Sequence, residues 1–182
     1  ELTQLPPELV PEKLTGLAPD GLIQRLTAYA ASHDTPVEYQ PLAQLGDANG
    51  YFRADRDGSN RRIVVGADLD EAAQAKTLIH EIAHMRLHVN DQGTDTSTKE
   101  IEAESTAYVV AAQFGLDTSQ YTFRYVGGWS GYDAGAIRET AQRVIDISAE
   151  ITDAVRVTRD VDSDANAEDR AAGLTYRTQS VA

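Results

Sequence analysis

The sequence predicts an α+β fold in which a small antiparallel sheet packs on a set of helices. Three short strand-like segments lie close together between residues 37 and 65. Before and after them, apolar residues recur at helical spacing. The chain has 182 residues, enough for one sizeable core. We therefore expect an irregular N-terminal segment (1–18), one domain (19–158) and a flexible polar tail or linker (159–182).

The first helix is expected to follow the proline-containing segment at the N-terminus. Asp20 is a favourable N-cap residue. The apolar residues after it have the helical period, and they are Leu22, Ile23, Leu26 and Ala30.

The expected strands cover residues 37–40, 51–54 and 61–65. Gly46, Gly50 and the Asp57-Gly58 pair lie between them and are turn signals. Because the connections are short, we expect the strands to form an antiparallel meander.

A helix is predicted over residues 71–88. Asp68 and Glu71 have the spacing of a capping box at its start. Leu78 and Ile79 are among the apolar residues that can bury one side of this helix, which leaves another side for polar groups.

His80, Glu81 and His84 form the pattern His-Glu-Ile-Ala-His inside this helix. Positions i and i+4 share a face, so both imidazoles can bind one metal ion. A third, carboxylate ligand on zinc leaves a position for water, whose pKa zinc lowers toward ~7, and Glu81 can take its proton. The chain has no cysteine, so a metal must use histidine and carboxylate. The alternative for a histidine pair is an ordinary helix face.

The third ligand is expected from the next helix, over about residues 98–114. Glu100 and Glu104 share one face of that helix, and Glu102 points roughly the opposite way. Ser97 and Glu100 also have capping-box spacing, so Glu100 could cap the helix instead. Small residues on the Glu100 face allow close helix approach, and they are Ala103, Ala107 and Ala111.

A last long helix is expected from near Asp133. Its apolar face is traced by Ile137, Ala141, Val144, Ser148, Ile151 and Val155. Apolar periodicity stops near Arg159, and the polar composition beyond it predicts a flexible tail.

The formal net charge of −13 disfavours direct binding to nucleic acid. It suits a basic protein partner, and mimicry of DNA is an alternative interpretation. No segment approaches the ~20 apolar residues of a membrane span. No signal peptide is evident, so the cytoplasm is the expected location.

Two segments resemble the ImmA/IrrE family of metallopeptidases. One is Thr-Leu-Ile-His-Glu-Ile-Ala-His-Met-Arg-Leu-His over residues 77–88; the other is Glu100, Ala103, Glu104 and Ala107. The likeness spans roughly residues 20–157, and it is to the branch found with ArdC-type antirestriction proteins on mobile elements. The resemblance implies a zincin-like metallopeptidase domain, with the sheet packed on the HExxH helix.

The resemblance also implies the roles of the site residues. His80, His84 and Glu100 would bind one Zn²⁺ per chain, and Glu81 would be the general base. Glu104 would hydrogen-bond the free nitrogen of a ligand histidine. Many relatives carry asparagine at the position of Glu104, so Glu104 stays an alternative third ligand.

A peptidase also needs a hydrogen-bond donor for the oxyanion. Tyr121, Tyr125 and His88 are candidates, and Tyr125 is preferred as a transition-state stabiliser. Together with Phe123 and Trp129, however, these tyrosines are also typical of a core between helices.

The expected function is a zinc-dependent endopeptidase. Its substrate is expected to be a specific repressor-type regulatory protein, held as an extended strand along residues 51–54 or 61–65. One alternative is a non-catalytic acidic antirestriction, DNA-mimic or protein-binding module with a structural metal. A second alternative is a fragment of a larger mobile-element protein.

Overall fold

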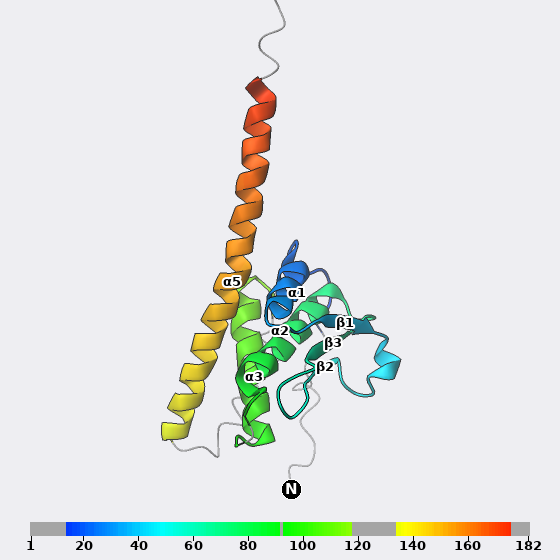
Figure 1. Cartoon of the computed structure of the whole chain (residues 1–182), viewed down its shortest axis with the longest axis vertical. Helices are drawn as coiled ribbons and strands as arrows, with labels where there is room; N and C mark the ends of the chain where they lie inside the picture. The colour runs from blue at the N-terminus through cyan, green and yellow to red at the C-terminus, as the bar shows by residue number, and fades with distance from the viewer. Residues whose placement is uncertain (1–13, 92, 118–133, 176–182) are drawn as a thin grey trace, which may run out of the picture.

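The computed structural model describes residues 14–91, 93–117 and 134–175 (Figure 1). Four α-helices and a small three-stranded sheet confirm the α+β class. In chain order the elements are α1 (Leu22–Ser32), β1 (Val37–Gln40), the 3-10 turn η2 (Leu42–Gln44), β2 (Gly50–Arg53), β3 (Arg62–Gly66), α2 (Glu71–His88), α3 (Thr96–Gln113) and α5 (Ala134–Thr175).

The sheet is mixed, so the expected antiparallel meander is wrong in one of its two pairings. The strand order is β1-β3-β2, with β2 antiparallel and β1 parallel to β3. β3 takes the middle position because Ile63, Val64 and Val65 form an uninterrupted apolar run, and all three are fully buried. Glu38 and Arg53 are exposed on β1 and β2, which suits edge strands.

The starts of the first two helices differ from the expected caps. Gly21, in a left-handed conformation with φ 68°, is the N-cap of α1 instead of Asp20. Asp70 is the N-cap of α2, and Asp68 accepts a hydrogen bond from the backbone of Leu42 at 2.9 Å. Glu71 accepts one from the backbone of Ala18. The two carboxylates whose spacing predicts a capping box, Asp68 and Glu71, therefore bind the backbone of Leu42 and Ala18 instead.

Helix α2 lies at the centre of the core. Its Leu78, Ile79 and Ile82 are fully buried and belong to one cluster with residues of α1, β3, α3 and α5. On α3, Ala103, Ala107 and Ala111 are also fully buried, as close packing against α2 requires. This packing brings the acidic face of α3 to the histidine face of α2.

Helix α5 packs along α3 and continues beyond the rest of the domain (Figure 1). Because it extends to Thr175, it occupies most of the segment where we expected a flexible tail. Residues 158–175 contain no proline and only one glycine, so a lack of apolar periodicity there does not exclude helix. The domain boundaries themselves remain predictions.

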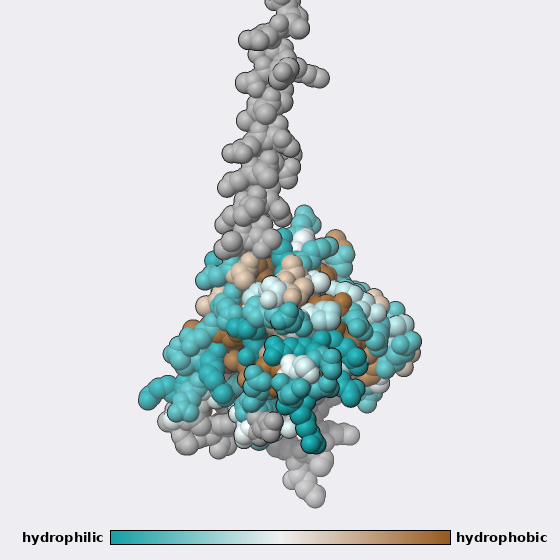
Figure 2. Space-filling model, in the orientation of Figure 1, coloured by the Kyte–Doolittle hydropathy of each residue, from teal (hydrophilic) through white to brown (hydrophobic). Residues whose placement is uncertain are grey.

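The visible face of the domain is mostly hydrophilic, with small separate apolar areas (Figure 2). Among the described helices, none combines the length and the apolar composition of a membrane span.

Candidate metal centre

Helix α2 places His80 and His84 one turn apart on the same face. Their Nε2 atoms lie 3.1 Å from each other. Leu78, Ile79 and Ile82 fix the opposite face of the helix in the core, so the helix cannot rotate and both rings stay on the same side. The ring pair meets edge to face, with centroids 4.8 Å apart.

Helix α3 brings Glu100 to both imidazoles. Its Oε2 lies 3.5 Å from His80 Nε2, and its Oε1 lies 3.4 Å from His84 Nε2. The capping alternative for Glu100 is not used, because Asp95 is the N-cap of α3 and accepts a hydrogen bond from the Thr98 backbone at 3.1 Å. Glu100 is therefore free to face α2.

These three residues bring one ligand atom each close enough together to bind a single zinc ion. Zinc–nitrogen and zinc–oxygen bonds of about 2.0–2.1 Å place neighbouring ligand atoms about 3.3 Å apart. The two Nε2 atoms, 3.1 Å apart, are close to that spacing. The Glu100 contacts of 3.5 and 3.4 Å are made by different oxygens, and one ligand atom from each of the three residues lies within 4.8 Å of the others. Within the described ranges, His80, His84 and Glu100 are the single group of such side chains that could hold a metal ion.

Glu104 lies one turn further along α3 and on the other side of the His80 ring. Its Oε2 is 3.0 Å from His80 Nδ1, and its other oxygen forms an ion pair with Lys76. The side chain is buried. The His80 ring therefore lies between two carboxylates. Its Nε2 faces Glu100, a candidate ligand, and its Nδ1 faces Glu104, which can fix the orientation of the ring.

Glu81 lies beside the histidines against strand β2. It is buried, and the backbone N–H of Phe52 donates a hydrogen bond to its carboxylate. Burial raises the pKa of Glu81, although His80 and His84 act in the opposite direction. A buried carboxyl group next to an open metal position is suited to accept and return a proton.

The electrostatics of the site favour a cation. Burial alone would lower the pKa of His80, but hydrogen bonds with Glu100 and Glu104 outweigh burial and raise it to about 9. Hydrogen bonds from His80 and His84 hold the pKa of Glu100 well below its usual range. A metal ion binding here would displace the proton on His80.

Glu102 and His88 extend this network, although the sequence suggested His88 only as an oxyanion donor and gave Glu102 no role. Glu102 is fully buried; it accepts from His88 Nε2 at 2.9 Å and forms an ion pair with Arg143 of α5. His88 Nδ1 lies 3.0 Å from His84 Nδ1. The spacing of His84 and His88 (i, i+4) is the sequence signal that could have found this contact.

The preferred transition-state stabiliser, Tyr125, lies outside the described residues. The same holds for Tyr121, Phe123 and Trp129.

A cleft of about 400 Å³ opens over the histidines. Gly50, Tyr51 and Phe52 of β2 form one wall, and Thr96, Lys99 and Glu100 form another. A smaller cavity adjoins it on the side of Lys76 and Glu104. The candidate ligands and Glu81 are therefore accessible along an edge strand.

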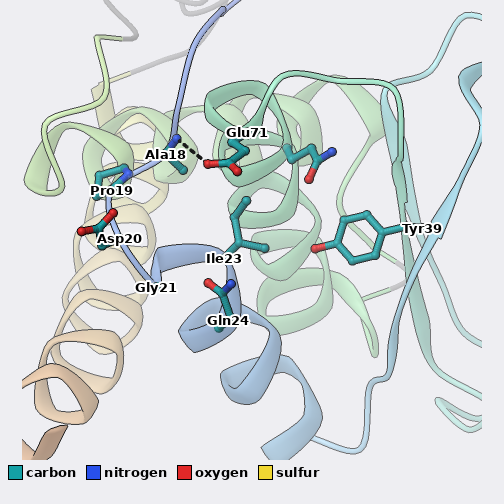
Figure 3. A pocket seen from close by; sticks show the side chains of 9 residues that line it. Ala18, Pro19, Asp20, Gly21, Ile23, Gln24, Tyr39 and Glu71 are labelled. Carbon is teal, nitrogen blue, oxygen red and sulfur yellow. Dashed lines mark hydrogen bonds between the residues drawn. The ribbon is translucent and has the colours of Figure 1, made fainter.

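A separate pocket lies over the start of α1 and contains none of these groups. Figure 3 shows Glu71 turned toward the backbone of Ala18, with Tyr39 on the opposite wall. No histidine lines it, so the candidate chemistry belongs to the cleft over His80 and His84.

Comparison with known proteins agrees with the site. The sequence profile of the IrrE N-terminal-like domain, Peptidase_M78, matches residues 30–151. An uncharacterized protein of Bacillus anthracis is 32% identical over 91 residues. That match covers 49% of this chain and 15% of the relative. No solved structure matches.

Proposed function

The chain belongs to the Peptidase_M78 family of IrrE N-terminal-like domains, and on this premise we propose that it is a zinc-dependent endopeptidase. One observation carries the proposal. His80, His84 and Glu100 converge in a cleft that also contains Glu81 and the edge strand β2. A purely structural metal needs neither a neighbouring buried carboxyl group nor an open face.

Zinc, when bound, supplies a Lewis acid that polarises the peptide carbonyl and makes water more acidic. The chain's own contribution to the chemistry is Glu81. Its carboxylate takes a proton from the attacking water and delivers it to the leaving amine. The hydrogen bond from the Phe52 backbone orients this carboxylate during both transfers.

The substrate is proposed to bind as an extended strand along β2. Of the two segments considered from the sequence, Arg62–Gly66 is the middle strand, whereas Gly50–Arg53 is an edge that lines the cleft. In an antiparallel ladder, alternate residues direct their backbone groups away from the partner strand. Phe52 directs its N–H away from β3, toward Glu81. Gly50 lies two residues earlier, so its backbone groups point the same way and are available to pair with a peptide.

The substrate class that we favour is a basic regulatory protein of the repressor type. The net charge of −13 would attract such a protein at long range and would repel nucleic acid. Function within a mobile element is part of the same proposal.

The test compares the wild type with Glu81→Gln. Both proteins would be loaded with zinc and incubated with a peptide library of diverse sequence, and products would be identified by mass spectrometry. We expect cleavage to fall ~10²–10⁴-fold in Glu81→Gln, because the general base is lost. Zinc content should be unchanged, since Glu81 is not in the ligand set.

Equal cleavage by a folded, zinc-loaded Glu81→Gln protein would contradict this mechanism. Zinc binding without any cleavage by the wild type, tested also on folded basic repressors, would favour a binding module with a structural metal.

A further inference from the structure

The two histidines of the metal centre have different hydrogen-bond partners at Nδ1, the ring nitrogen that faces away from the ligand set. His80 Nδ1 contacts the carboxylate of Glu104 directly, at 3.0 Å. His84 Nδ1 instead contacts another imidazole, that of His88, at 3.0 Å. The carboxylate on this side, Glu102, is one step further away and lies 2.9 Å from His88 Nε2.

The hydrogen-bonded series His84–His88–Glu102 allows one arrangement of protons when a metal is bound. His84 directs Nε2 to the ligand set, so its ring proton is on Nδ1. His88 must accept that proton at Nδ1 and therefore carries its own on Nε2. This Nε2–H donates to Glu102, whose other oxygen is paired with Arg143. Every group is satisfied, and no alternative tautomer of His88 satisfies His84.

Because these side chains are buried, removing one of them would leave its hydrogen-bond partner without a replacement. The Glu102 side chain is 0% exposed and that of His88 is 5% exposed, so solvent has little access to either. A buried carboxylate is strongly disfavoured unless it is paired and hydrogen-bonded. Glu102 meets this requirement through α2 on one side and α5 on the other.

We propose that His88 and Glu102 are positioning residues, which hold His84 in the tautomer and orientation that metal binding needs. Neither residue belongs to the candidate ligand set; His88 also lines the cleft, and both act on the metal through His84. Arg143 completes the arrangement, so the packing of α5 on α3 supports the metal centre. This inference rests on the proposed metal site but not on cleavage.

The experiment is a set of zinc affinities measured by chelator competition on the full chain. The variants are His88→Leu, His88→Asn, His88→Gln and Glu102→Gln. We expect His88→Leu to weaken binding ~10–100-fold, the range typical of groups that orient a metal ligand. Asparagine places its carbonyl oxygen near the position of Nδ1, so His88→Asn should recover part of the loss. Glutamine places its amide nitrogen near Nε2, where it serves Glu102 but not His84, and should recover less.

Glu150→Gln is the matched control. Glu150 ties α5 to α1 and α2 through Tyr29 and Arg86, and none of these residues lines the cleft. This variant should lose thermal stability but keep the zinc affinity of the wild type. A general effect of weaker α5 packing would lower both properties.

Cobalt substitution gives a second measurement that does not depend on activity. The visible absorption of bound Co²⁺ reports ligand geometry, and we expect it to change in His88→Leu and to return toward the wild type in His88→Asn.

The inference would be overturned if His88→Leu bound zinc within twofold of the wild type with the same cobalt spectrum. Recovery by glutamine but not by asparagine would also overturn it, because that pattern indicates only a partner for buried Glu102. If His88→Leu does not fold, the asparagine and glutamine pair decides in the same way. A wild type that binds no metal would remove the proposed function and this inference together.

Discussion

Two clusters that include residues of helix α2 combine histidine and glutamate, and among the described residues only one of them has side chains placed to hold a metal. The cleft cluster faces α3 and consists of His80, His84, His88, Glu100, Glu102 and Glu104. The clamp cluster lies where α2 meets α1 and α5 and consists of Tyr29, His33, Arg86 and Glu150.

The difference lies in how donors and acceptors are arranged. In the clamp cluster, the Tyr29 hydroxyl donates to Glu150 at 2.7 Å, and Arg86 donates to the same carboxylate at 2.9 Å. Donors therefore already occupy the acceptor atoms, and His33 Nε2 is 4.0 Å away. In the cleft cluster, three acceptor atoms converge while their supporting partners lie behind them. Convergence of possible ligand atoms on one point, not residue composition, makes a metal site.

The largest expected effect comes from removing a ligand histidine. His84→Ala should abolish stoichiometric zinc binding, measured by elemental analysis. Zinc at 1,000 times the dissociation constant stabilises a folded protein by ~4 kcal/mol, so the variant should also lose the zinc-dependent rise in melting temperature. Retained zinc in folded His84→Ala would mean that the cleft is not the metal site. His33→Ala, in the clamp cluster, is the control and should keep its zinc.

The two glutamates on one face of α3 provide the next test. Glu100→Ala should lose bound zinc, because it removes a ligand atom. Glu104→Ala should weaken zinc binding only ~10–100-fold, because Glu104 orients His80 from behind. Both would be measured by chelator competition. The reverse order would make Glu104 the ligand and would require the His80 ring to turn.

The clamp cluster should affect stability alone. Glu150→Gln removes the charged partner of Arg86, whose interaction is partly exposed to solvent. We expect a loss of about 0.5–1 kcal/mol in the free energy of unfolding. Calorimetry should show a decrease of ~2–4 °C in melting temperature, with no change in zinc affinity. A lower zinc affinity would show that the two clusters are coupled.

The smallest effect is the pH dependence of the difference in free energy of unfolding between the wild type and Glu150→Gln. Burial tends to raise the pKa of Glu150, but hydrogen bonds from Tyr29 and Arg86 outweigh burial and lower it. A depressed folded-state pKa contributes stability that is present above the unfolded pKa and is lost as pH falls through the folded value. The stability difference between wild type and Glu150→Gln should thus be constant near neutral pH and shrink below pH ~4.5. A difference that grows on acidification would contradict this assignment.

Local features could be predicted from the sequence because they depend on near neighbours. The bounds of α2, residues 71–88, were predicted from apolar periodicity together with a capping-box spacing that the structure does not use. The shared face of His80 and His84 follows from helix geometry. β1 was likewise placed at its observed bounds, 37–40, by composition and turn residues. The order and direction of the strands could not be predicted, because pairing depends on which strand is buried on both faces.

The segment after residue 158 illustrates the same limit. Missing apolar periodicity removes the usual sequence signal of a helix, but it does not exclude helix. The structure continues α5 to Thr175.

The sequence by itself determined the chemistry available to this protein: two histidines and a glutamate on one helix, acids on the next, and no cysteine. Only the tertiary structure decided how the acids of α3 are used. Glu100 faces both imidazoles, Glu104 lies behind His80, and Glu102 lies buried against His88 and Arg143. The physical reason is that α3 is covered on two sides, by α2 and by α5. A carboxylate on either side must find a partner there, and no spacing along the chain specifies which partner that will be.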